Sequence, residues 1–169
     1  MPLPPGQRAV EGFPRFGTHL HHPPPPVPEH PVIEIDGAVT APVTLSETDL
    51  AQLPRQRMET DFHCVAGWSA TGLVWEGTPL NSDHGAPVRL VSPRQYGFVN
   101  TKHLCRIEFH TSPPADPEKW SPLAAHRRAR VWEEERHRYL PARVVRPIYH
   151  RLIGPIRALS ARGSEKRTR

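Results

Sequence analysis

The chain has 169 residues, enough for a single domain with its own hydrophobic core and a tail. Its 22 prolines disfavour long helices, because proline fixes one backbone dihedral and donates no hydrogen bond. The net charge of +5 favours anionic partners, two cysteines are too few for a disulfide framework, and no apolar run reaches the roughly 20 residues of a membrane span. The N-terminus lacks the basic start and apolar run of a signal peptide, so we expect a cytoplasmic protein.

The N-terminal segment, residues 1–31, is rich in proline and histidine, and we expect it to be an extended arm or a flexible leader. Residues 32–45 predict two short strands around a turn. Ser46, with Asp49 three residues later, matches a capping box and predicts a short helix over residues 46–53.

Further short strands follow, separated by turns that contain glycine or proline. They are predicted at residues 57–65, 74–77, 88–91 and 104–109. The sequence therefore predicts an α+β domain, mostly β, over residues 32–111.

The C-terminal third is expected to be helical after a proline-rich linker at residues 112–122. Dense arginine and glutamate predict a polar helix at the start of a helical tail, residues 123–162. Residues 163–169 are expected to be disordered.

An apolar stripe recurs every four residues within this tail and predicts an amphipathic helix with proline interruptions. Its members are Val144, Ile148, Leu152 and Ile156. We expect the stripe to dock on the domain, on a partner protein or on an anionic membrane surface, with a protein surface preferred.

A cysteine lies where a predicted strand enters a glycine-containing turn, in the string D-F-H-C-V-A-G-W-S at residues 61–69. Thiolate suits a heavy, redox-active metal, although a cysteine taken alone is more often a core residue. A second block, H-G-A-P-V-R-L-V-S-P at residues 84–93, leads through Y-G-F at residues 96–98 to Lys102.

These two blocks, in this order, resemble the oxidoreductase molybdopterin-binding domain, the catalytic fold of sulfite oxidases and bacterial methionine-sulfoxide reductase catalytic subunits. The resemblance covers residues 10–111. It implies a molybdenum–molybdopterin cofactor and a sulfite-oxidase-class enzyme that moves an oxygen atom to or from a small oxyanion or sulfoxide-like substrate. A separate electron-transfer partner is also expected, because the chain has no C-x-x-C-H haem motif.

Carried over residue by residue, the resemblance implies that Cys64 is the catalytic residue, as the thiolate bound to the metal. Arg89 would bind the pterin phosphate through charge-assisted hydrogen bonds, and Lys102 would line the same phosphate. Taken alone, Arg89 and Lys102 could equally be ordinary surface charges, and Cys105 is expected in the core. The other residues implied to contact the cofactor are His84, Asn100, Thr101, Phe16 and His19.

The chain departs from the family's pattern in its centre. Between W-E-G-T-P-L at residues 75–80 and His84 stand only Asn81, Ser82 and Asp83, where family members carry a few tens of residues. We therefore expect an internally shortened domain. The alternative function is an inactive homologue, or one that only binds the cofactor.

Two further alternatives come from the residues themselves. A zinc-binding module could use His63, Cys64, His103 and Cys105, although their spacing is unusual for zinc. A basic binder of nucleic acid or of a membrane surface is suggested by the pI of 9.8. No nucleic-acid partner is expected, because Glu133–Glu135 neutralise the neighbouring arginines.

Overall fold

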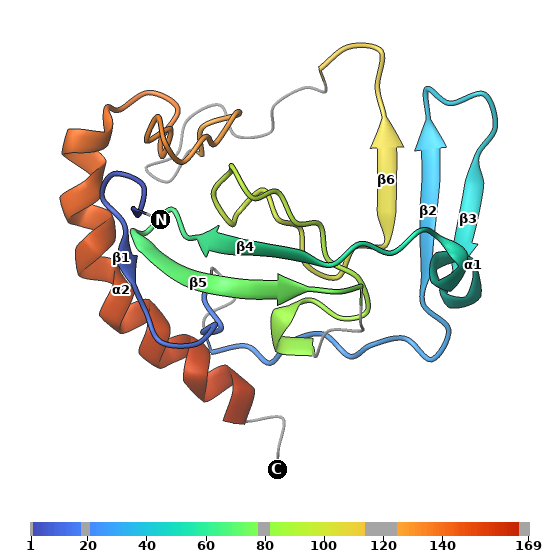
Figure 1. Ribbon diagram of the computed structural model, residues 1–169, viewed down its shortest axis with the longest axis horizontal. Coiled ribbons are helices and arrows are strands. Elements are labelled where there is room, and N and C mark those ends of the chain that lie inside the picture. Colours follow the sequence, from blue (N-terminus) through green and yellow to red (C-terminus); the bar gives the residue numbers. More distant parts are fainter. Residues whose placement is uncertain (1, 18–20, 78–81, 114–124, 166–169) are drawn as a thin grey trace.

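The computed structural model describes residues 2–17, 21–77, 82–113 and 125–165 (Figure 1). Within these ranges, the strands form two three-stranded sheets, and one long helix, α2 (Ala142–Glu165), follows them in the chain. The fold is α+β and mostly strand, as the sequence predicted.

The first sheet has the order β1-β5-β4 and consists of an antiparallel hairpin with an added N-terminal strand. The hairpin is formed by β4 (Met58–His63) and β5 (Trp68–Trp75), and β1 (Arg8–Ala9) pairs in parallel with β5. Part of the expected N-terminal arm is therefore an integral strand. Its Arg8 N donates to Gly67 O at 3.0 Å.

The second sheet has the order β3-β2-β6, with β2 (Val32–Gly37) at its centre. The strand β3 (Val43–Ser46) is antiparallel to β2, and β6 (Arg106–Phe109) is parallel to it. The helix α1 (Glu47–Gln52) begins at the predicted capping box, in which the Asp49 carboxylate accepts from Ser46 N at 2.8 Å.

Two predicted elements are absent. Residues 88–91 run extended but form no strand; Leu90 N donates to Thr101 O at 3.0 Å instead. The helix predicted from residue 123 is not found in the described residues 125–140, which form turns. Ala129 and Glu134 have φ of 52° and 50°, a left-handed backbone that a right-handed helix cannot contain.

The main core lies between the hairpin and α2, which runs beside β1 in Figure 1. Val145 and Tyr149 of α2 pack there, whereas Val144 and Ile148 of the predicted stripe are 47% and 54% exposed. The helix thus docks on its own domain, but through a face offset by one residue from the expected one. The helix has two apolar rows with the same spacing, one beginning at Val144 and one at Val145. The buried row is the one that contains the aromatic side chain of Tyr149. Among the described residues, no helix is long and apolar enough to cross a membrane.

Candidate functional site

Cys64 begins the tight turn that joins β4 to β5. Cys64 N donates to Trp68 O at 2.8 Å, and Gly67 N donates to Cys64 O at 3.0 Å. Gly67 has a φ of +108°, and a β-carbon at this position would collide with the imidazole of His150 on α2. Only glycine lets the turn and the helix approach this closely.

Side chains from both ends of the chain hold this turn. Gln7 Nε2 donates to Cys64 O at 3.2 Å. The fully buried guanidinium of Arg136 donates to Val65 O and, at 3.1 Å, to Gly6 O. The turn is therefore fixed by residues more than fifty positions before it and about seventy positions after it in the sequence.

The sulfur of Cys64 lies in an apolar cluster and is 8% exposed as a residue. Burial raises the pKa of the thiol to about 12, and a backbone hydrogen bond from Ala66 and the charge of Arg136 oppose this only in part. In this conformation Cys64 is a neutral thiol. A metal could be bound only after the sulfur loses its proton.

A buried hydrogen-bond chain beside Cys64 fixes the protonation of His63. Gln7 Nε2 donates to Cys64 O, so Gln7 Oε1 accepts the proton of Ser69 Oγ at 3.0 Å. Ser69 Oγ must then accept from His63 Nδ1 at 2.8 Å. Burial lowers the pKa of His63, with a smaller opposing effect of Asp61, and Nε2 of the neutral ring keeps its lone pair.

Three cationic side chains gather around Asp83. Arg15 Nε lies 3.5 Å from Asp83 Oδ1, and Lys102 Nζ donates to Asp83 O at 2.9 Å. Arg89 Nη1 donates to His84 O at 3.0 Å. We call Arg15, Arg89 and Lys102 the basic cluster.

Positive charge is in excess at this cluster. The pKa of Lys102 is lowered to about 8, mainly by burial and then by the charges of Arg89 and Arg15. The opposing effect of the Asp83 carboxylate is smaller than that of either arginine. Burial alone lowers the pKa of Arg89 to about 10. An anion bound here would relieve this repulsion.

Arg89 connects the basic cluster to the core that holds Cys64. Its guanidinium carbon lies 4.9 Å from the ring centre of Phe62 and 5.3 Å from that of Phe13. Phe62 belongs to the same core cluster as Cys64. Arg89 Nε is buried and has no hydrogen-bond partner among the described residues. Arg89 therefore contacts the core cluster to which Cys64 belongs.

The remaining predicted cofactor residues occupy different surroundings. His84 Nε2 donates to Phe13 O at 2.7 Å, beside the basic cluster. Asn100 is buried and accepts from Ser92 N at 2.7 Å, whereas Thr101 is exposed. Phe16 packs against Trp68 with ring centres 5.6 Å apart. His19 lies outside the described residues.

The residues of the predicted zinc module are not brought together. Cys64 is buried and Cys105 is exposed on the second sheet. Within the described ranges, no group of three or more histidine, cysteine or acidic residues could hold a metal ion. This prediction is wrong, because two neighbouring His/Cys pairs in sequence do not converge in the fold.

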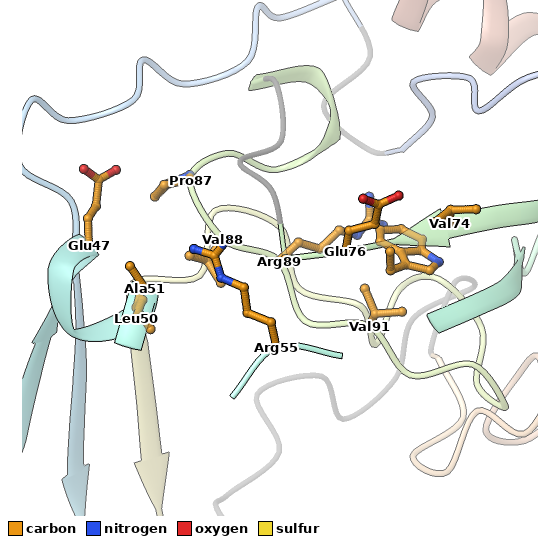
Figure 2. A pocket seen from close by; sticks show the side chains of 12 residues that line it. Glu47, Leu50, Ala51, Arg55, Val74, Glu76, Pro87, Val88, Arg89 and Val91 are labelled. Carbon is orange, nitrogen blue, oxygen red and sulfur yellow. The ribbon is translucent and has the colours of Figure 1, made fainter. Parts of the chain in front are cut away.

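A pocket of about 440 Å³ lies between α1 and the end of β5 (Figure 2). Figure 2 shows Pro87 and Val88 on the side of Leu50 and Ala51 of α1, and Arg89 farther along the pocket, toward Glu76. Its charged lining also includes Arg55, Glu47 and Glu76, but neither Cys64 nor Lys102 lines it. The pocket thus reaches the cluster through Arg89 and leaves the sulfur covered.

Sequence reasoning missed two contributors to this region. Arg15 stood in the N-terminal segment that the resemblance covered, but only its neighbours Phe16 and His19 were selected. Arg136 was read as a charge on a polar helix. No local signal marked either residue, because their partners, Asp83 and Val65, lie far away in sequence.

Comparisons with known proteins agree with these features. The sequence profile of the oxidoreductase molybdopterin binding domain matches residues 70–118, a stretch that begins after Cys64 and includes Arg89 and Lys102. The chain is also similar to the uncharacterized oxidoreductase YuiH of Bacillus subtilis (strain 168), at 25% identity over 186 residues. The alignment covers 79% of this chain and 91% of that protein. Since 79% of 169 residues is fewer than 186, the relative contains stretches that this chain lacks.

Proposed function

We propose that the chain is a molybdenum–molybdopterin-dependent enzyme of the sulfite-oxidase class, because it is similar to molybdopterin-binding oxidoreductases over residues 70–118 and to a relative named as an oxidoreductase. When bound, the cofactor supplies oxygen-atom transfer in two-electron steps, to or from a small sulfur-type oxo substrate. Electrons pass to a separate protein partner. We propose a cytoplasmic location.

The observation that carries this proposal is the excess positive charge of the basic cluster beside the core of Cys64. A pterin phosphate is an anion, and Arg89 can offer it a planar pair of N–H donors. The buried, unpartnered Nε of Arg89 and the lowered pKa of Lys102 are both relieved by such a ligand. The residues therefore fit the anionic end of the cofactor.

The surroundings of Cys64 fit the metal of the cofactor less well. Cys64 supplies a suitable ligand atom, but its sulfur is covered by apolar side chains and its thiol pKa is about 12. The proposal therefore requires the surroundings of Cys64 to open before the metal is bound. Tyr149 of α2 and Phe62 belong to the covering cluster.

The test is elemental analysis of protein produced in a host that makes the cofactor. We expect molybdenum in the native chain, a large loss in Cys64→Ser, and weaker retention in Arg89→Met and Lys102→Met. Cys105→Ser is the matched control, because this cysteine is exposed on the other sheet. Equal molybdenum in native protein and Cys64→Ser would refute the thiolate assignment.

A second function, cofactor binding without turnover, is favoured by the covered sulfur and by the gapped alignment with the relative. A dye-linked assay with sulfite and with a sulfoxide separates the two functions. Bound molybdenum with turnover of either substrate supports the enzyme. Bound molybdenum without turnover supports the binding-only homologue.

A further inference from the structure

Docking on the domain leaves one face of α2 directed outward. Val145 and Tyr149 are buried, as is Ser160 three turns later. At 100° per residue these three positions lie on one side of the helix. The opposite side of the helix therefore faces solvent in the folded molecule.

Exposed apolar side chains run along this outward face. Val144 and Ile148 are 47% and 54% exposed and lie one turn apart on this side, whereas Leu152, 36% exposed, lies about 20° from Val145 around the helix and only flanks the face. Pro147, Pro155 and Ala158 lie on the same side and are also exposed. Water is a poor environment for a stripe of this length, which marks a contact surface.

Arginines are interleaved with this stripe. Arg151 and Arg162 project from the same face and Arg143 lies at its edge, and all three are exposed. Residues 142–162 contain no acidic residue to neutralise them. Arg157 of α2 is exposed as well. Arg146 is ion-paired with Glu134 and does not belong to this surface.

These features point to one kind of occupant. It must be anionic, because the face is basic, and it must accept aliphatic side chains, which excludes free phosphate or nucleic acid as sufficient ligands. A membrane surface with acidic lipids satisfies both needs, because arginines can reach headgroups while their neighbours enter the acyl boundary. Trp132 and Tyr139, exposed in the segment that leads into α2, are the aromatic types common at such boundaries.

We propose that the outward face of α2 docks the protein on the surface of a membrane that contains acidic lipids. The helix lies in the plane of the surface, with Val144 and Ile148 inserted and Arg143, Arg151 and Arg162 at the headgroups. This inference is independent of the cofactor and of the reaction.

The test is co-sedimentation of the full chain with vesicles of phosphatidylglycerol and phosphatidylcholine in equal parts, and with vesicles of phosphatidylcholine alone. We expect binding to the acidic vesicles only. Arg151→Glu should lower the partition coefficient about tenfold or more, since each charge near the surface contributes about fivefold. Ile148→Ser should lower it about tenfold through the loss of apolar burial.

Two control variants make the same kinds of substitution at exposed positions outside α2. Arg94→Glu makes the same change in net charge at an exposed site outside α2, and Ile107→Ser removes another exposed isoleucine, 37% exposed against 54% for Ile148, from β6. Both should change the partition less than about twofold. Circular dichroism of each variant establishes that it is folded.

Three results would overturn the proposal. The first is no binding to acidic vesicles. The second is an equal loss in Arg151→Glu and Arg94→Glu with none in Ile148→Ser, which would show attraction by net charge alone. The third is self-association or a protein complex that depends on Ile148 without lipid, which would make this face a protein interface.

Discussion

Burial disfavours the charged form of Lys102, and the nearby charges of Arg89 and Arg15 add to this effect. The folded chain thus holds the Lys102 proton less tightly than the unfolded chain, with a pKa of about 8 against an ordinary value of 10.5. Between these two pH values the unfolded chain binds the extra proton. The contribution of Lys102 to the free energy of unfolding therefore rises with pH across this window.

Replacement of Lys102 by methionine should remove this pH dependence. We expect the stability of the native chain relative to Lys102→Met to increase by about 1 kcal/mol between pH 7.5 and pH 9.5, a value reduced for partial exposure. Urea unfolding at the two pH values measures it. A constant difference between the two proteins would contradict the lowered pKa of Lys102 in the folded chain.

The thiol of Cys64 should be slow to react in the folded protein. With a pKa of about 12 and an apolar cover, its thiolate is scarce at pH 8. Iodoacetamide should modify exposed Cys105 at least about a hundredfold faster than Cys64, and the two should react alike in urea. Mass spectrometry of a time course measures both rates, and comparable rates in the folded chain would show that the sulfur is open.

At the scale of elements, α2 packs closely against the turn between β4 and β5. Gly67 allows the approach of His150, whose Nε2 donates to Gly6 O at 3.1 Å. A second glycine, Gly154, lies inside α2 with nothing within 4 Å of the position a β-carbon would take. The same substitution should therefore have opposite effects at these two sites.

Gly67→Ala should destabilise the protein by about 2 kcal/mol or more, because it combines a strained φ with a collision. Gly154→Ala should stabilise it by about 0.5–1 kcal/mol, because alanine loses less backbone entropy in a helix. Urea unfolding of both variants provides the comparison. A neutral Gly67→Ala would mean that α2 does not contact the turn.

The sequence predicted those elements whose signals are local. The capping box of Ser46 and Asp49 located α1, and alternating β-branched residues located β2 and β3. The buried face of α2 could not be chosen, because rows beginning at Val144 and at Val145 have the same spacing. The helix expected from residue 123 failed because the Glu135 carboxylate binds the backbone and guanidinium of Arg130, which stabilises turns instead.

The sequence singled out Arg89, Lys102 and Cys64 but not the geometry around them, and their binding of a cofactor stays a prediction. Arg89 and Lys102 do meet, as the resemblance implied, since both approach Asp83 or its neighbour His84. The depth of Cys64 was not foreseeable, because it is set by Tyr149, more than eighty residues later. Long-range packing of this kind leaves no local pattern.

Across the whole molecule, Arg136 joins segments that are distant in sequence. It contacts the N-terminal Gly6, Val65 in the turn and the ring of Tyr96, whose centre lies 5.1 Å from its guanidinium carbon. Its charge is balanced by Glu134, which also pairs with Arg146 of α2. A buried cation with these partners is costly to remove.

Arg136→Met should lower the free energy of unfolding by about 3 kcal/mol or more, because several carbonyl groups and Glu134 lose their partner. Arg143→Met, on the exposed side of α2, is the control and should change it by less than about 0.5 kcal/mol. Limited proteolysis of the Arg136 variant should release the N-terminal segment first. Equal stability of the two variants would show that the contacts of Arg136 do not stabilise the fold.

The cover over the Cys64 sulfur also has an order in time. Tyr149 and Val145 leave the ribosome well after the β4–β5 hairpin, so the nascent hairpin has no helix above it during translation of the intervening residues. A large ligand that binds this sulfur would therefore meet less apolar cover before α2 docks than after it. The proposed function thus predicts that cofactor is taken up more readily during synthesis than by the finished fold.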